Sequence, residues 1–210
     1  MRLSFQRKLL VLLATVVSGA LHAYATDGVF PDYDSYLAFL YGDLILLAPG
    51  LILGLLTAPF LFYGNRQFIG KTIAWVVVTG VSFFIAFVIT MFFEAFLADA
   101  GVPGAHILAF AIGGFSGALI LSIGFAVFQD LEVKIGKIKW KVTLSAGTVL
   151  GALFGNTYST TSEAAEFLFF SISTYAYDIS QWLFVVWPTV IIALLLFWPN
   201  QKEQIPQIPK

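Results

Sequence analysis

The sequence predicts an all-α membrane protein: a six-transmembrane-helix bundle with both termini in the cytoplasm and short outer interfacial helices. Three observations predict it. The chain of 210 residues is 59% hydrophobic and only 11% charged, whereas a soluble domain carries about 25% charged residues. Six apolar segments are long enough, or nearly so, to cross a bilayer. Basic and acidic connections alternate along the chain.

A membrane-spanning helix needs about 20 mostly apolar residues. Continuous apolar runs, rather than alternating ones, indicate helices, and a helix pairs its own backbone amides within the hydrocarbon. The first and fifth segments are short, at 17 residues each. The predicted spans are Leu9–Ala25, Leu44–Tyr63, Ile73–Leu97, Ile107–Phe128, Val142–Tyr158 and Trp182–Trp198.

The first segment has a second interpretation. Arg2, Arg7 and Lys8 precede the apolar run Leu9–Gly19, and Ala23-Tyr24-Ala25 is typical of a signal-peptide cleavage site. A multispanning protein usually keeps its first helix as an anchor, so we expect residues 1–25 to be retained. Cleavage would remove one span without inverting the others.

Two outer connections are longer than turns. Asp34–Leu40 and Glu163–Tyr177 combine aromatic and acidic residues, and Thr160–Glu163 fits a capping box that opens a helix. We expect helices lying in the outer interface, or extensions of the following spans. Residues 1–198 are predicted to form a single transmembrane domain and 199–210 a short polar cytoplasmic tail.

The positions of the charges predict the orientation. The connections after the first, third and fifth spans, counted with Glu94 at the outer end of the third span, hold nine acidic residues and no basic residue. Cytoplasmic loops retain Lys and Arg, so the basic clusters are predicted to lie inside, as in a multi-pass protein of a bacterial inner membrane. These basic residues are Arg2, Arg7, Lys8, Arg66, Lys71, Lys134, Lys137, Lys139, Lys141, Lys202 and Lys210.

Small residues and tryptophans predict how the spans pack. Glycines spaced four apart share one helix face, where a neighbouring backbone can approach closely. Trp75, Trp140 and Trp198 adjoin basic clusters and are predicted to be interfacial anchors, whereas Trp187 lies inside the sixth span beside Pro188, a predicted kink. The glycines expected in helix contacts are Gly50, Gly54, Gly113, Gly117, Gly147, Gly151 and Gly155.

A layer of carboxylates and imidazoles is predicted at one depth, near the outer boundary. Oxygen and nitrogen donors suit a divalent cation such as Mn, Fe or Zn, so a cation is the one cofactor that the sequence suggests. No ligand spacing supports the site, and ordinary solvated boundary groups remain the alternative. The candidate ligands are His22, Asp43, Glu94, Asp99 and His106.

The fourth span contains Gly114-Phe115-Ser116-Gly117, which resembles the G-x-S-G motif of rhomboid intramembrane proteases. That resemblance implies a serine nucleophile with a histidine base from a later span. No histidine follows Ser116 in this chain. His106 lies ten residues earlier, about 15 Å along the same helix. The chain is therefore not expected to be a serine protease.

The residue types exclude several kinds of chemistry. Without cysteine there is no disulfide, thiolate ligand or thiol nucleophile. There is no phosphate-binding glycine loop, no ionisable residue deep within a span, and nothing indicates nucleic-acid binding. We expect a small-solute or cation transport protein, or a transporter subunit, with an acidic outer face. The alternative is a non-catalytic accessory, assembly or immunity-type protein, whose partner is a second copy or another membrane protein.

Overall fold

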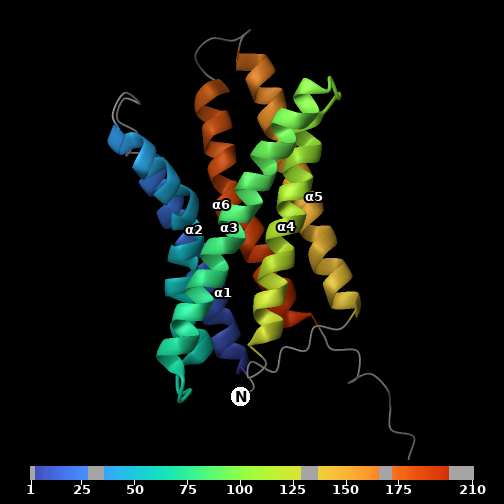
Figure 1. Ribbon diagram of the computed structural model, residues 1–210. Coiled ribbons are helices and arrows are strands. Elements are labelled where there is room, and N and C mark those ends of the chain that lie inside the picture. The colour runs from blue at the N-terminus through green and yellow to red at the C-terminus, as the bar shows by residue number, and fades with distance from the viewer. Residues whose placement is uncertain (1–2, 28–35, 129–136, 166–171, 199–210) are drawn as a thin grey trace, which may run out of the picture.

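The computed structural model describes residues 3–27, 36–128, 137–165 and 172–198, with side chains for 3–22, 47–128, 137–154 and 185–198. Within these ranges all regular structure is helical, in six helices without a strand (Figure 1). The predicted all-α fold is confirmed. The helices are α1 (Phe5–Asp27), α2 (Tyr36–Phe62), α3 (Phe68–Asp99), α4 (Ala105–Val127), α5 (Lys137–Ala165) and α6 (Ile172–Phe197).

Two of the described helices have the length and composition of a membrane span. They contain 23 to 32 residues, or about 35–48 Å at 1.5 Å per residue, against about 30 Å of hydrocarbon. By length and composition, α3 and α4 are apolar enough to cross a membrane. Shorter apolar stretches lie in α2, at Leu47–Phe62, and in α6, at Val185–Phe197.

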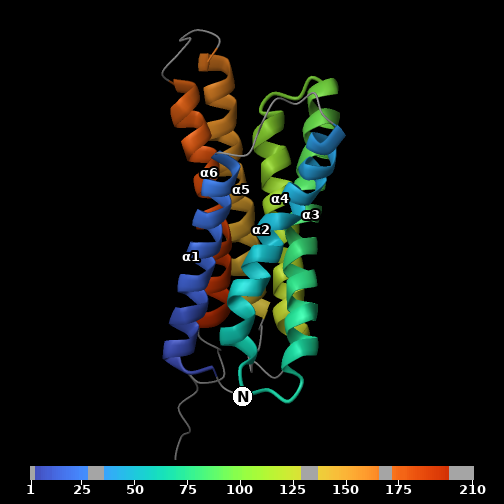
Figure 2. The same ribbon diagram turned by 90° about the vertical axis from the view of Figure 1, so that its left-hand side faces the viewer.

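The six helices close into a ring in chain order. Each packs mainly against its neighbours in sequence, and α6 returns to pack against α1. Successive helices run in opposite directions, so α1 begins and α6 ends at the same end of the bundle (Figures 1 and 2). We call this the basic end, since it carries the described lysines and arginines. The other end, where α3 joins α4, is called the acidic end.

Of the two predicted alternatives for the longer outer connections, the described residues show extensions of spans and no separate interfacial helix. The described part of Asp34–Leu40 belongs to α2, which runs without a break from Tyr36 to Phe62. Glu163 belongs to the end of α5, and Ile172 already begins α6. Continuous helices keep their backbone groups paired, which favours extending a span over starting a new helix. The residues between, 166–171, and the predicted tail, 199–210, lie outside the described ranges.

The described core includes a cluster of aromatic side chains next to the basic end. Trp75 is fully buried there, with ring centroids of Phe125 and Phe128 at 4.9 and 5.8 Å. Its indole Nε1–H donates to the hydroxyl of Thr57 at 2.8 Å, joining α3 to α2. Thr57 in turn donates to the carbonyl of Leu53. The prediction that Trp75 is an interfacial anchor is wrong, because its polar atom has a partner inside the bundle.

Glycines permit the closest helix contacts. At the crossing of α4 and α5, a Cβ on Gly147 would lie 2.6 Å from both the Cβ of Ala118 and the carbonyl oxygen of Gly114. A Cβ on Gly151 would overlap the carbonyl of Phe110. Such contacts let backbones approach where lipid supplies no hydrophobic driving force. Gly50 and Gly54 lie in the same way against α3, and Gly113 and Gly117 against α3 and α6, while the surroundings of Gly155 are outside the described side chains.

Candidate functional site

The turn between α3 and α4 positions the first candidate site, at the acidic end. After α3 ends, Gly101 and Gly104 adopt φ of +66° and +72°, a left-handed conformation that costs glycine little. The amide of Gly101 donates to the carbonyl of Ala98 at 2.9 Å, and that of Val102 to Leu97 at 3.0 Å. These bonds satisfy carbonyls at the end of α3. The tight turn sets the last turns of α3 against the first turn of α4.

Glu94 and His106 meet across this hairpin. The His106 Nδ1 lies 2.6 Å from a carboxylate oxygen of Glu94, and the side chains are 34% and 21% exposed. Glu94 continues a row on α3 spaced by four residues through Thr90, Ala86 and Ser82, and this row faces α4. The pair therefore joins α3 to α4 near the acidic end, where solvent reaches both side chains. A carboxylate hydrogen-bonded to an imidazole can hold a proton or offer two ligands to a cation.

The other residues of the predicted outer layer lie apart from this pair. Asp99 is exposed at the last residue of α3. His22 is buried on α1, which packs mainly against α2 and α6 rather than α3 and α4. The side chain of Asp43 is outside the described set. Among the described side chains, no three residues of the ligand-forming types gather, so a cation site there stays a prediction.

Trp187 is the second candidate, at mid-height in the bundle. It projects from α6 and is 5% exposed, with its ring 5.7 Å from that of Phe83 on α3. A Cβ on Gly117 of α4 would lie 2.7 Å from its ring carbon Cη2. Its Nε1–H is buried and has no hydrogen-bond partner in the structure as described. A buried donor without an acceptor is rare and asks for an explanation. Sequence reasoning located Trp187 beside Pro188 but could not show this orientation.

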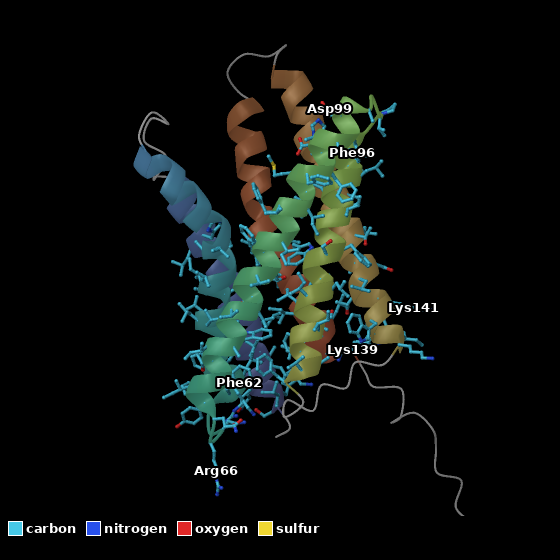
Figure 3. The ribbon with its side chains drawn as sticks, viewed as in Figure 1. Phe62, Arg66, Phe96, Asp99, Lys139 and Lys141 are labelled. Atoms are coloured by element: carbon cyan, nitrogen blue, oxygen red, sulfur yellow. The ribbon has the colours of Figure 1, made fainter. Side chains whose placement is uncertain are left out.

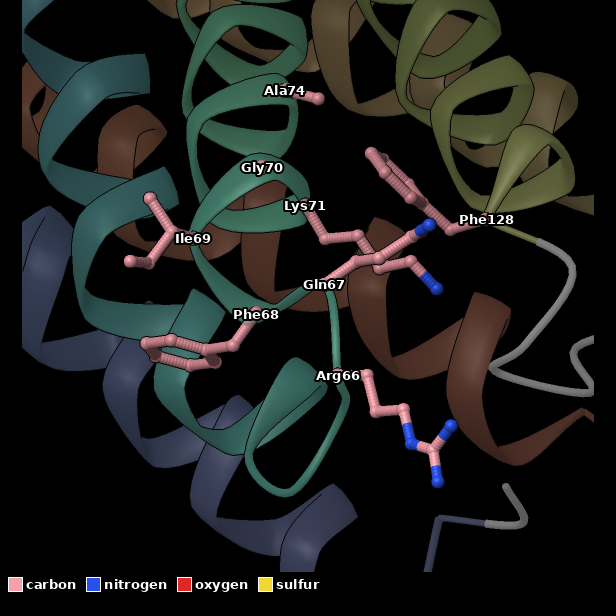
Figure 4. A pocket seen from close by; sticks show the side chains of 8 residues that line it. All are labelled: Arg66, Gln67, Phe68, Ile69, Gly70, Lys71, Ala74 and Phe128. Carbon is pink, nitrogen blue, oxygen red and sulfur yellow. The ribbon is translucent and has the colours of Figure 1, made fainter.

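A groove of about 700 Å³ lies at the basic end, beside the turn from α2 to α3 (Figure 4). Arg66, Gln67 and Lys71 line it, with Phe128 of the α4 terminus on the opposite side. The groove is open, and its cations face the solvent at the start of α3. It is an open, basic depression of the surface.

Ser116 has no catalytic neighbour of the kind that its motif requires. Its hydroxyl donates to the carbonyl of Ile112 at 2.8 Å, the common bond of a helical serine to its own backbone. Since α4 is unbroken from Ala105 to Val127, His106 stays about 15 Å away along the helix axis.

Charge separates the two ends of the bundle. Arg66, Lys139 and Lys141 lie at one end and Asp99 at the other (Figure 3). Arg7 and Lys8, in the first turn of α1, share the basic end, and the Arg7 guanidinium donates to the carbonyl of Tyr63 at 3.2 Å. The separation follows the alternation of basic and acidic connections in the sequence.

Comparisons of this chain with protein-family models, with curated proteins and with solved structures found no match. Its function is therefore argued from its own residues.

Proposed function

We propose that the chain spans a membrane six times, with its basic end in the cytoplasm. The lengths of the helices, their ring order and the collection of described lysines and arginines at one end support this topology. Positively charged residues are retained on the cytoplasmic side, and each helix is long enough to cross the hydrocarbon.

Single-cysteine labelling tests this topology directly, because the natural chain has no cysteine. Gln67→Cys and Ala100→Cys place exposed thiols in the α2–α3 and α3–α4 turns. In intact cells, a membrane-impermeant maleimide should label the second and not the first, and permeabilisation should make both reactive. Labelling of both in intact cells, or of Gln67→Cys alone, would refute the topology.

The activity that we propose is transport of a small cation or other small solute through the ring. The observation that carries this proposal is Trp187, a buried side chain that reaches from α6 to α3 and α4 and whose indole N–H has no acceptor among the described residues. In a transport protein such a residue closes the path in the resting state. Its free donor can bind water or solute when the helices separate, and its ring face can attract a cation.

Glu94 and His106 give the proposed path a polar entrance at the acidic end. Their side chains are partly exposed and hydrogen-bonded to each other, so an arriving cation meets a carboxylate and an imidazole before the apolar interior. The acidic outer connections raise the local concentration of cations by electrostatic focusing. The core between Trp187 and the basic end is packed with apolar side chains, as expected of a closed state.

The test is flux into proteoliposomes that contain the purified protein, measured for monovalent and divalent cations with ion-sensitive dyes. Trp187→Ala should raise the basal flux above that of the parent. Phe115→Ala is the matched control, because it removes an aromatic side chain that is 39% exposed on α4. Glu94→Gln and His106→Gln should lower the flux, while Asp99→Asn, at an exposed position five residues after Glu94, should not.

Equal fluxes through the parent, Trp187→Ala and empty liposomes would overturn the transport proposal. If the parent also retains a stoichiometric second polypeptide after mild extraction, the accessory-protein alternative replaces it.

A further inference from the structure

Lys139 is a buried cation at the basic end of the bundle. It lies in the first turn of α5, before the apolar span that begins near Val142, and is 4% exposed. Its Nζ approaches the carbonyl oxygen of Trp198, at the end of α6, at the long distance of 3.5 Å. An ammonium group has three N–H donors, and a buried one requires a counter-charge or full hydrogen bonding. Lys139 has neither among the described residues.

A second ammonium lies on the other side of the α6 terminus. Lys8 of α1 stands over the ring of Phe197, with its Nζ 5.6 Å from the ring centroid. Burial, with a smaller contribution from the positive charge of Lys8, lowers the pKa of Lys139 to about 8. Both ammonium groups therefore lie at the α6 terminus, and each disfavours the charge of the other. The end of a helix supplies roughly half a negative charge, which is too little to balance two ammonium groups.

The surroundings of the two lysines suit both the phosphate group and the acyl chains of a phospholipid. Phe5 and Phe197 pack edge to face at 5.9 Å beside Lys8, and Phe5 is 67% exposed. An exposed apolar surface next to paired cations, at the level where α1, α5 and α6 meet the inner boundary, suits acyl chains below a phosphate. A free phosphate ion would make no use of the aromatic surface.

We propose that Lys8 and Lys139 bind the phosphate group of an anionic phospholipid of the inner leaflet, in the seam between α1, α5 and α6. Basic residues between helices on the cytoplasmic side are suited to such headgroups. The bound phosphate supplies the counter-charge that the buried ammonium of Lys139 does not find among the described residues. This inference uses the membrane orientation proposed above, and it does not depend on transport.

Lys141 provides a matched control. It lies two residues after Lys139 on the same helix, carries the same charge and is exposed. Figure 3 shows both lysines at the lower end of α5, with the Lys141 side chain directed away from the bundle. Lys139→Met and Lys141→Met therefore change the net charge equally, and only the first removes the buried ammonium.

The experiment measures the thermal unfolding midpoint of the full chain in nanodiscs of phosphatidylcholine alone or with phosphatidylglycerol. The parent and Lys141→Met should gain about 3 °C or more from phosphatidylglycerol, a readily measured shift for a chain of this size. Lys139→Met should lose that gain. In phosphatidylcholine it should be at least as stable as the parent, because an uncompensated buried charge has been removed.

Three outcomes would overturn the proposal. The first is an equal gain from phosphatidylglycerol in Lys139→Met and Lys141→Met. The second is an equal loss of stability on Lys139→Met in both lipids, which would mean that Lys139 has a partner within the chain. The third is a gain from inorganic phosphate in phosphatidylcholine nanodiscs as large as that from phosphatidylglycerol, which would make the ligand a free ion. If Lys139→Met does not fold, Lys8→Met is measured in the same way, with the same expected loss.

Failure of this site and failure of the proposed topology give different results. If the basic end faced outward, the cysteine labelling would be inverted while the stabilisation by phosphatidylglycerol remained. If only the lipid site were wrong, the labelling would be as expected and the two lysine variants would behave alike.

Discussion

Gly147→Ala tests the packing of α4 against α5. The added Cβ would lie 2.6 Å from the Cβ of Ala118 and 2.6 Å from the carbonyl oxygen of Gly114. Ordinary contact begins at 3.4 Å, so the helices must separate by ~0.8 Å, enough to lose much of the dispersion energy along the seam. One of the two neighbours is backbone, and therefore no change of rotamer can relieve the overlap.

Whether Gly147→Ala raises or lowers the free energy of unfolding depends on two opposing contributions. Replacing glycine by alanine inside a helix favours folding by about 1 kcal/mol, whereas overpacking a close contact costs about 1–3 kcal/mol. The cost lies toward the upper part of that range, because close packing is itself what holds membrane helices together. We expect a net loss of about 1 kcal/mol or more, and a midpoint lower by about 2–4 °C for each kcal/mol.

Gly70→Ala is the control for this prediction. A Cβ at Gly70 would have nothing within 4 Å, so only the helix-propensity term remains and the variant should be slightly more stable than the parent. Both variants are measured by thermal and dodecyl-sulfate unfolding in the same detergent. If Gly147→Ala were as stable as Gly70→Ala, the α4–α5 contact could not be as close as described.

Three further predictions concern polar groups. Thr57→Val leaves the buried Nε1–H of Trp75 without its acceptor and should cost about 1–3 kcal/mol of unfolding free energy, while Thr57→Ser should cost less. Glu94→Gln and His106→Gln should show a coupling of about 0.5–1 kcal/mol in a double-mutant cycle, small because both side chains are partly exposed; strict additivity would mean that their contact is absent in solution. Since burial lowers the pKa of Lys139 to about 8 from 10.5, the unfolded chain binds more protons between these values. Stability in phosphatidylcholine should therefore rise with pH across that window and stay flat in Lys139→Met.

The helices and the charge separation could be predicted from the sequence because both depend on local composition. Apolar runs of sufficient length predict helices whatever their neighbours are, and the basic residues at Arg66 and Lys139 end up at the same end of the bundle because the chain reverses with each helix. The glycines spaced four residues apart also allowed close helix contacts to be predicted. Gly114 was left out of the predicted contacts, although its carbonyl oxygen meets Gly147, because it stands outside the four-residue spacing of Gly113 and Gly117.

Helix rotation could not be predicted, and it decides the sites. Depth alone put Glu94 and Asp99 in one layer, but five residues of helix turn them to different faces, so that only Glu94 reaches His106. Trp75 lies at the depth of an interfacial anchor and yet faces inward, because α2 offers the hydroxyl of Thr57 there. Lys139 belongs to a run of lysines for which the sequence predicts exposure to solvent. In the structure it is buried where it meets the end of α6.

The described contacts of α3 change in kind along its length, and this bears on where the protein can open. Toward the basic end, α2, α3 and α4 are joined by the Trp75 aromatic cluster and by the Trp75–Thr57 hydrogen bond. Toward the acidic end, the described contacts between α3 and α4 include the approach of Gly113 to Thr90 and Ala86 and the Glu94–His106 pair, which water can reach. Between the two halves, Pro188 lies inside α6 directly after Trp187. A proline inside a helix removes one backbone hydrogen bond and favours bending. We therefore expect α6 to bend most easily next to Trp187. Movement of the acidic half about this point would displace Trp187 while the Trp75 cluster and its hydrogen bond to Thr57 stay in place, and the proposed transport cycle requires such a motion.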